Sequence, residues 1–281
     1  MAKIFEALDK TGLTEQLFQG MDDTNVPSAA VPGPTASVGS QPNNAASSAH
    51  VFKAVSLHVP GMSPVLPFEQ SGQASEQYRI LRTKIVQHLR QPRVLIVSSP
   101  SAGDGKSITA LNLAGALALK GAANVLLIDG DFRRPSIWRN LGLEESPGLA
   151  NILAGTASLE ESILRAEQFG TLHILRAGKS EHNPTELLDS QVFNTTFARL
   201  KQIFKYIVID SPPIASVADY DLLTAAADGV ILVVRPDHTS RLACNKAIET
   251  IPKEKFLGVV MNRVTEWFLN KSYGYAPYYY Y

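Results

Sequence analysis

Two groups of residues in this chain have the types and spacing needed for chemistry on a phosphate. One is the loop Ser99-Pro100-Ser101-Ala102-Gly103-Asp104-Gly105-Lys106-Ser107, and the other is a row of tyrosines at the C-terminal end. Glycine-rich loops of this kind bind nucleotide phosphates, and a phenol hydroxyl can accept a phosphoryl group. Their presence in one chain makes the tyrosines candidate phosphoryl acceptors.

The loop lies between the apolar run Val94–Ser98 and a helical pattern, which is the context a phosphate-binding loop requires. Gly103 and Gly105 let backbone N–H groups approach phosphate oxygens, Lys106 would reach the β and γ phosphates, and the Ser107 hydroxyl would bind Mg²⁺. The predicted ligands are ATP and Mg²⁺. The predicted nucleotide contacts are Ala102, Gly103, Asp104, Gly105, Lys106, Ser107 and Ile108.

The loop departs from the strict motif at one position. The motif has a glycine six residues before the lysine, where this chain has Pro100. The alternative interpretation is a glycine-rich turn before an ordinary helix, and the Gly-Lys-Ser core after a strand favours the phosphate loop.

Acidic residues follow two other apolar runs. Asp129 and Asp131 come after Leu126–Ile128, and Asp210 comes after Tyr206–Ile209. Open parallel sheets bind ligands at the carboxyl ends of their strands, so these side chains are predicted to lie near the loop. Asp210 has the position of the aspartate that holds Mg²⁺ through its water shell. Ser107, Asp129 and Asp210 are therefore the predicted metal-site residues.

Asp129 and Asp131 are one residue apart, so a strand end points them in different directions and they cannot serve one metal equally. One of them is predicted to accept the proton of an attacking hydroxyl. A tyrosine would benefit from such a base because the pKa of a phenol is about 10. The alternative is that Asp129 or Asp131 only caps the following turn.

Six of the nine tyrosines lie in the last nine residues: Tyr273, Tyr275, Tyr278, Tyr279, Tyr280 and Tyr281. This run has neither strand alternation nor a helical face, so a packed role is not expected. Tyrosine beside glycine and proline also occurs in disordered, self-associating tails, which is the alternative to a phosphoryl acceptor.

The rest of the chain is organised around one domain. We predict a short amphipathic helix over 1–19, a disordered linker over 20–73, a nucleotide-binding domain over 74–268 and a flexible tyrosine-rich tail over 269–281. The linker is rich in Pro, Ala, Ser, Gly and Asn and has few large apolar residues. Such a composition cannot bury enough surface to fold.

Within the domain, short β-branched runs alternate with helical patterns. This predicts an α/β fold with a mostly parallel sheet and helices on both faces. The predicted strands are Val94–Ser98, Val125–Ile128, Leu172–Leu175, Tyr206–Ile209, Val230–Val234 and Leu257–Met261. The predicted helices are Ser75–Leu89, Ser107–Leu119, Val192–Phe204, Tyr220–Ala226 and Thr239–Ile251.

Composition narrows the class of protein. Acidic and basic residues number 26 each, so no net field favours nucleic acid. Cys244 is the single cysteine, which rules out an internal disulfide and suits a reducing compartment. No apolar stretch approaches the roughly 20 residues of a membrane span, and no signal peptide is evident, so a cytoplasmic protein is expected.

Taken together, these motifs resemble those of the bacterial tyrosine kinases, a family of P-loop autokinases. The resemblance covers residues 72–281. Asp129, Asp131 and Arg133 match the family's Asp-x-Asp-x-Arg motif, in which the aspartates assist metal binding and tyrosine deprotonation. Glu76, Arg79 and Arg82 match its Glu-x-x-Arg-x-x-Arg motif, which helps neighbouring subunits form a ring. On its own, that last triplet would be an ordinary solvated helix face.

The resemblance implies autophosphorylation of the C-terminal tyrosines and control of capsule or exopolysaccharide export. It also implies a ring-like homo-oligomer and a separate transmembrane activator of the polysaccharide chain-length type, which would recruit the protein to the membrane. Other protein substrates are possible. Lys106, Asp129, Asp131, Arg133 and Asp210 are the implied catalytic residues. By analogy Asn262 contacts the adenine edge, with a strand-end cap as the alternative.

The alternative function is a non-kinase ATPase switch or scaffold. The cell-division and plasmid-partitioning ATPases share this fold and carry a second lysine early in the phosphate loop. Five residues before Lys106 this chain has Ser101. The missing lysine favours the kinase.

Overall fold

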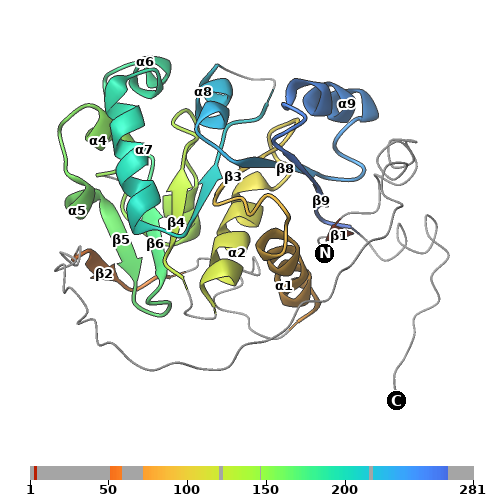
Figure 1. The fold of residues 1–281 in the computed structure, drawn as a ribbon, viewed down its shortest axis with the longest axis horizontal. Coiled ribbons are helices and arrows are strands. Elements are labelled where there is room, and N and C mark those ends of the chain that lie inside the picture. The colour runs from red at the N-terminus through yellow and green to blue at the C-terminus, as the bar shows by residue number, and fades with distance from the viewer. Residues whose placement is uncertain are drawn as a thin grey trace, which may run out of the picture. The chain divides into compact units, whose positions relative to one another are not determined.

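The computed structural model describes residues 3–4, 51–58, 72–119, 123–145, 147–214 and 218–264. This part of the chain forms a sheet with the strand order β1-β9-β8-β3-β7-β4-β6-β5-β2 (Figure 1). Neighbouring strands are parallel except in the pairs β1–β9 and β5–β6. The mostly parallel sheet predicted from the sequence is therefore confirmed.

The strands are β1 (Lys3–Ile4), β2 (Lys53–Val55), β3 (Val94–Ser98), β4 (Val125–Asp129), β5 (Ile163–Ala166), β6 (Leu172–Leu175), β7 (Tyr206–Asp210), β8 (Gly229–Val234) and β9 (Phe256–Met261). The helices are α1 (Gln73–Val86), α2 (Lys106–Ala118), α3 (Ile137–Asn140), α4 (Leu149–Leu153), α5 (Leu159–Ser162), α6 (Pro184–Leu188), α7 (Gln191–Ile203), α8 (Asp219–Ala225) and α9 (Arg241–Thr250). Every helix and strand predicted within the nucleotide-binding domain is present, with ends shifted by at most three residues.

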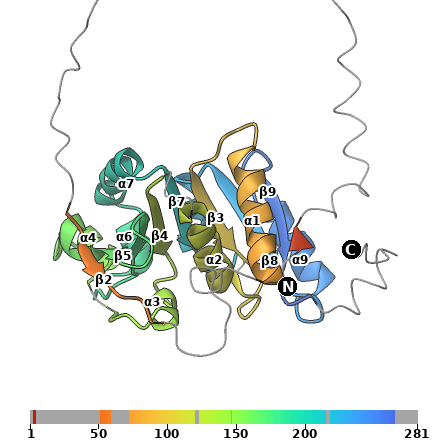
Figure 2. The same ribbon diagram turned by 90° about the horizontal axis from the view of Figure 1, so that it is seen from below.

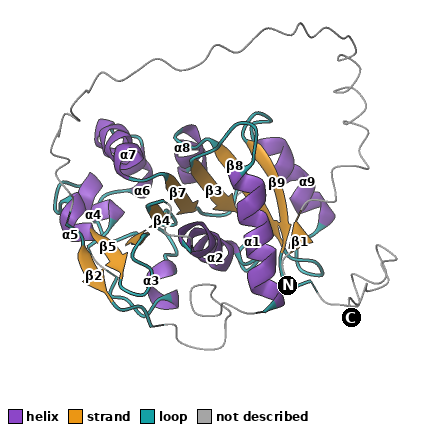
Figure 3. Cartoon of the chain, turned by 60° about the horizontal axis from the view of Figure 1, so that its bottom comes forward, coloured by secondary structure: helices purple, strands orange, loops and turns teal. Residues whose placement is uncertain are grey.

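Helices cover both faces of the sheet because its central strands are apolar on both sides. In β3, Leu95 and Val97 join a core with α1 and α2, whereas Val94 and Ile96 join a core with α4, α6, α7, α8 and α9. Successive strand residues point to opposite faces, which explains the alternation. Figures 2 and 3 show α1 and α2 together on one side of the sheet. No described helix has both the length and the apolar character to cross a bilayer.

The strand register brings the predicted site residues to one edge of the sheet. Asp210, the last residue of β7, is paired with Val97 of β3 on one side and with Asp129 of β4 on the other. The chain leaves β3 directly into the glycine-rich loop. The loop and both carboxylates therefore emerge side by side at the carboxyl ends of three adjacent parallel strands.

The predicted helix over residues 1–19 is wrong for Lys3–Ile4, which form β1. This strand pairs antiparallel with β9, with Lys3 opposite Met261 and Ile4 opposite Val260. The edge of β9 offers backbone N–H and C=O groups that a short segment can satisfy in extended form. The remaining residues of that prediction lie outside the described part of the chain.

The predicted linker over residues 20–73 is wrong for 51–58 and Gly72–Gln73. Gln73 begins α1, and Lys53–Val55 form β2, an edge strand parallel to β5. Phe52 and Leu57 are buried on either side of β2, and the Phe52 ring lies 6.0 Å from the ring of Phe204. Two apolar anchors hold this strand, although the average composition of the surrounding segment is polar.

Candidate active site

The glycine-rich loop has the backbone geometry of a phosphate cradle. Gly103 and Gly105 have φ of 89° and 97°, a left-handed conformation that favours glycine, and α2 begins at the next residue, Lys106. A side chain at Gly105 would also collide with the amide of Asn262. The loop therefore needs glycine for its backbone conformation and for the close approach of Asn262.

Asp104 holds this loop from inside the protein. Its buried carboxylate accepts hydrogen bonds from Thr239 Oγ1 at 2.7 Å and from the Ser101 backbone N–H at 3.0 Å, and it lies 2.9 Å from His238 Nδ1. Its backbone oxygen accepts a bond from Asn262 Nδ2 at 2.9 Å. Thr239 and His238 are site residues that sequence reasoning missed, because they come from the distant segment between β8 and α9.

Asn262 itself lies at the end of β9, where its backbone N–H donates to Val234 O at 2.8 Å. Asn262 therefore has the strand-end position considered as the alternative to an adenine contact, and the Asn262 side chain supports the loop through its hydrogen bond to Asp104. Contact with the adenine edge stays a prediction.

Lys106 lies between two carboxylates. Its Nζ is 3.0 Å from Asp131 Oδ2, 3.3 Å from Asp210 Oδ1 and 3.4 Å from Ser107 Oγ. Burial alone would lower the pKa of Lys106, but the charges of Asp210 and Asp131 outweigh burial and raise it. The lysine is therefore held as a cation at the position where the loop would receive a phosphate.

Asp129 is fully buried and does not line the cavity at the phosphate loop. Its Oδ2 accepts hydrogen bonds from the backbone N–H groups of Ser136 and Ile137, both at 2.9 Å, so it caps the start of α3. Burial, and then the charge of Asp210, raise the pKa of Asp129 to about 7. The capping alternative is therefore present at Asp129, and its metal and catalytic roles stay predictions.

Asp131 has two contacts with different functions. Its Oδ2 faces Lys106, and its Oδ1 accepts the backbone N–H of Arg134 at 3.0 Å, which closes the following turn. Oδ1 thus has the turn-capping role considered as an alternative, whereas Oδ2 of the same carboxylate faces the active site. Asp131 lines the cavity at the phosphate loop.

The oxygen atoms of Asp210 and its neighbour Ser107 are of the type that binds Mg²⁺. Its Oδ2 is buried and has no hydrogen-bond partner, whereas Oδ1 faces Lys106. Burial, only partly offset by the charge of Lys106, raises the pKa of Asp210. A hard cation with its water shell would satisfy this oxygen, and Mg²⁺ usually binds through one or two carboxylates together with substrate phosphates. The Ser107 hydroxyl beside Lys106 belongs to the same group of oxygen ligands.

A cavity of about 590 Å³ lies at the phosphate loop. Its lining includes Gly103, Gly105, Lys106, Ser107 and Asp131. Ala102 and Ile108 also line it, together with Arg134, Ser136, Pro212, Pro213 and Arg263, and the nucleotide contacts of Ala102 and Ile108 stay predictions. Arg263 was missed by sequence reasoning, and its φ of 54° is a conformation uncommon for a residue with a side chain.

Arg133 also lines the cavity and is held by a buried acid. Its Nε donates to Asp219 Oδ2 at 2.9 Å, and Thr185 Oγ1 donates to Asp219 Oδ1 at 2.6 Å. Asp219 is 1% exposed, whereas the Arg133 side chain is 47% exposed. The buried carboxylate therefore holds the Nε side of a half-exposed guanidinium that belongs to the lining of the cavity.

Comparisons with known proteins identify the family. A family model described as AAA domain matches residues 92–256. Tyrosine-protein kinase YwqD of Bacillus subtilis (strain 168) is 36% identical over 192 residues, which cover 67% of this chain and 80% of the relative. The chain belongs to the bacterial tyrosine-protein kinases. The resemblance stated from the motifs is confirmed.

Solved structures agree with this assignment. The VpsO kinase domain has 35% identity and a TM-score of 0.62, and the match covers 68% of this kinase and 95% of that chain. The septum site-determining protein MinD of Pyrococcus horikoshii, complexed with Mg-ADP, has 26% identity and a TM-score of 0.50 over 59% of this kinase and 68% of that chain. The fold of the kinase is therefore a nucleotide-binding fold.

The predicted oligomerisation residues of the kinase lie on α1. Arg79 Nη1 is 3.1 Å from Glu76 Oε2, with both side chains about half exposed, and Arg82 follows one turn later. An exposed ion pair of this kind adds about 0–1 kcal/mol of stability, so stability alone does not explain the triplet. Its part in oligomerisation stays a prediction, and the six tail tyrosines lie outside the described residues.

Asp129 should give the nucleotide-free kinase a pH-dependent stability. Its ordinary pKa of 3.8 is raised to about 7 in the fold, so the unfolded chain releases this proton at lower pH than the folded protein. Stability should therefore fall as pH rises from about 4 to about 7 and level off above. Asp129→Asn keeps the acceptor for Ser136 and Ile137 but carries no charge. It should remove on the order of 2 kcal/mol of this pH dependence, measured by urea unfolding at pH 5 and pH 8.

The comparison with the variant is needed because other groups titrate in the same window. Burial lowers the pKa of His173, which makes stability rise with pH and opposes the Asp129 effect. The difference between wild type and Asp129→Asn cancels that contribution. Equal pH profiles for the two proteins would show that the Asp129 carboxyl is not perturbed.

Proposed function

We propose that this kinase transfers the γ-phosphoryl group of ATP to the C-terminal tyrosines of a neighbouring subunit. The observation that carries the proposal is the position of Lys106 between Asp131 and Asp210 at the start of α2, in a chain that ends in a row of tyrosines. The acceptors would be Tyr273, Tyr275, Tyr278, Tyr279, Tyr280 and Tyr281.

The chain's own residues account for most of the chemistry. Loop N–H groups and Lys106 bind and orient the phosphates, and the Arg133 guanidinium adds positive charge near the transferred group. Ser107 and Asp210 would hold Mg²⁺, which would supply neutralisation of charge on the phosphate oxygens. A phenol oxygen forms the new bond to phosphorus as the bond to the ADP oxygen breaks.

The proton of that phenol goes to Asp131. Asp131 and Asp129 both match the family motif, but only Asp131 lines the cavity, while both oxygens of Asp129 accept backbone N–H groups. Asp129 therefore supports the turn that carries Asp131. This assignment selects one of the two carboxylates that the sequence left open.

We also propose how the subunits assemble and where in the cell the reaction takes place. A ring of subunits, contacting through Glu76, Arg79 and Arg82, would present each tail to the next active site, and a transmembrane partner would recruit the kinase to the cytoplasmic face of the membrane. Each phosphotyrosine adds about −1.5 to −2 charges, so a heavily modified tail would leave the acidic site of its neighbour. Family membership supports a role in exopolysaccharide or capsule synthesis, and other protein substrates would use the same site.

A mixing experiment tests transfer between subunits. One variant carries Lys106→Met with an intact tail, and the other carries phenylalanine at all six tail tyrosines with an intact site. Neither should label itself with ATP, whereas their mixture should acquire phosphotyrosine on the Lys106→Met chain alone, read by mass spectrometry. ATP hydrolysis by the wild type without any phosphotyrosine would instead support the ATPase switch.

A further inference from the structure

A second cavity, of 790 Å³, lies beside the nucleotide cavity, and neither Lys106 nor the carboxylates of the strand ends line it. Its walls come from the turn after β4, from α4 and the residues on either side of it, from the loop between β6 and α6, and from α6 itself. Arg133 lines both cavities, so they adjoin at this side chain. A group bound in the second cavity would therefore lie next to the site of phosphoryl transfer.

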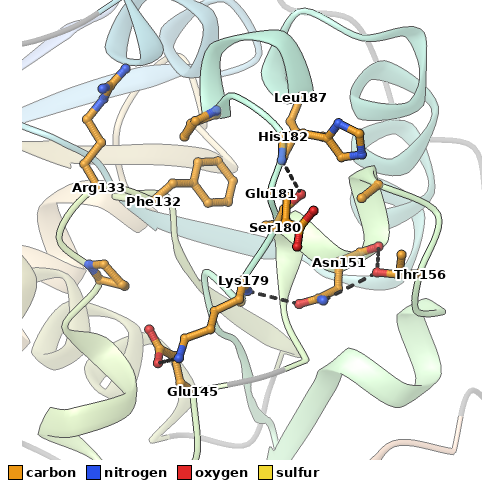
Figure 4. Close-up of a pocket in the computed structure, with 15 residues that line it drawn as sticks. Phe132, Arg133, Glu145, Asn151, Thr156, Lys179, Ser180, Glu181, His182 and Leu187 are labelled. Carbon is orange, nitrogen blue, oxygen red and sulfur yellow. Dashed lines mark hydrogen bonds and ion pairs between the residues drawn. The ribbon is translucent and has the colours of Figure 1, made fainter.

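The lining is suited to an uncharged aromatic ring. Phe132, Ala154 and Leu187 supply apolar surface, and Figure 4 shows the Phe132 ring between Arg133 and His182. Aromatic rings pair with other rings in stacked or edge-on geometry, which adds to the stabilisation gained from burial. Phe132 thus offers a contact for a ring inserted from outside.

The charges of this cavity do not favour a phosphate. The cationic side chains Arg133 and Lys179 both have carboxylate partners, Asp219 at 2.9 Å and Glu145 at 2.8 Å. Glu181 adds a further acidic side chain to the lining, which also contains His182. A dianionic group would meet two carboxylates here, whereas a phenol would not be repelled.

We propose that this cavity binds an unmodified tyrosine of the C-terminal tail of a second copy while another tyrosine of the same tail reacts. The inference rests on the proposed function, because it places the second ring relative to the reacting one. An extended chain advances about 3.3–3.6 Å per residue, so tyrosines two or three positions apart are about 7–11 Å apart. The spacing of Tyr273, Tyr275 and Tyr278 therefore allows two rings to occupy adjoining cavities.

This arrangement would make the kinase prefer tails that still carry unmodified tyrosines. Phosphorylation of the ring in the second cavity would place about −1.5 to −2 charges beside Glu145 and Glu181 and release the tail. The density of tyrosines then has a binding function as well as an acceptor function.

The test measures binding of a labelled peptide with the sequence of residues 271–281, without ATP. The host is the full chain with its six tail tyrosines changed to serine, so that its own tail does not compete. Ala154→Trp should fill the cavity and weaken binding at least tenfold, measured by fluorescence anisotropy. Leu242→Trp, on exposed α9, is the matched control and should bind normally. A peptide phosphorylated at every tyrosine should bind at least tenfold more weakly than the unmodified one.

Two checks keep the result clear. Both variants should bind fluorescent Mg-ADP like the host, and Thr156→Trp, at an exposed position of the same lining, replaces Ala154→Trp if that variant does not fold. Equal peptide affinity in the cavity and control variants, or tighter binding of the phosphopeptide, would overturn the inference. A binding peptide that is never phosphorylated would refute only the proposed function. Peptide affinity that is unchanged in the cavity variant, together with normal phosphorylation of the peptide, would refute only binding in the second cavity.

Discussion

Lys106→Met is expected to abolish tyrosine phosphorylation and, as a separate effect, to destabilise the nucleotide-free kinase. The activity should fall about 10³-fold or to background, because removing one preorganised positive group from a phosphoryl-transfer site leaves developing charge without a partner. Phosphotyrosine formed per minute, at saturating ATP, measures this loss.

The loss of stability follows from burial of the cluster. Lys106 is the cation between Asp131 and Asp210, and its side chain is only 11% exposed. Removing one partner of a buried ion pair typically costs about 3–5 kcal/mol, because the remaining charges stay in a poorly solvated site. The two carboxylates can relieve this cost by binding protons in the folded state.

The pH dependence of that loss is a second measurable result. Without Lys106, the pKa of Asp210 should rise further, so the folded variant holds a proton that the unfolded chain has already released. Stability of Lys106→Met should therefore fall more steeply than that of wild type between pH 5 and pH 8. Urea unfolding at both pH values gives the comparison.

The double variant Lys106→Met with Asp210→Asn separates the two effects. Asp210→Asn removes one of the two buried carboxylates that have lost Lys106, so it should restore part of the stability, while phosphorylation stays absent. A single variant as stable as wild type at pH 8 would contradict the buried ion cluster. A variant that keeps its phosphorylation rate would contradict the role of Lys106.

The parts of the site that the sequence predicts are those encoded within a few consecutive residues. The glycine loop, Lys106 and Ser107 follow one strand, and the acidic residues follow two others, so the rule for parallel sheets brings them together. The contacts that hold them were missed. His238 and Thr239 reach Asp104 across more than 130 positions, and no local pattern connects such residues.

Edge strands were missed for a related reason. β2 has only three residues, and the surrounding composition is that of a linker. Its position depends on Phe52, which lies 5.3 Å from the ring of His173 on β6. Such a strand forms because a partner surface already exists, so propensity and periodicity carry little information about it.

The other large effect concerns Asp219, which we expect to position Arg133. Asp219→Ala would free the guanidinium and leave the Thr185 hydroxyl without its acceptor. A displacement of about 1 Å in a catalytic group can cost on the order of 10²-fold in rate, and we expect a fall in kcat of that size. The KM for ATP should change little, because the phosphate loop is held by Asp104 and Asn262 instead. Steady-state kinetics of tail phosphorylation gives both constants.

The decisive comparison is with Arg133→Ala. If Asp219 acts through Arg133, then Arg133→Ala alone and the double variant should lose the same activity, because the second change removes nothing that still functions. Thr185→Val, which removes only the second hydrogen bond to Asp219, should have a smaller effect on kcat. Losses that multiply in the double variant would show that Asp219 acts independently of Arg133. Weakened Mg-ADP binding by Asp219→Ala would show instead that the buried carboxylate supports the fold of the site.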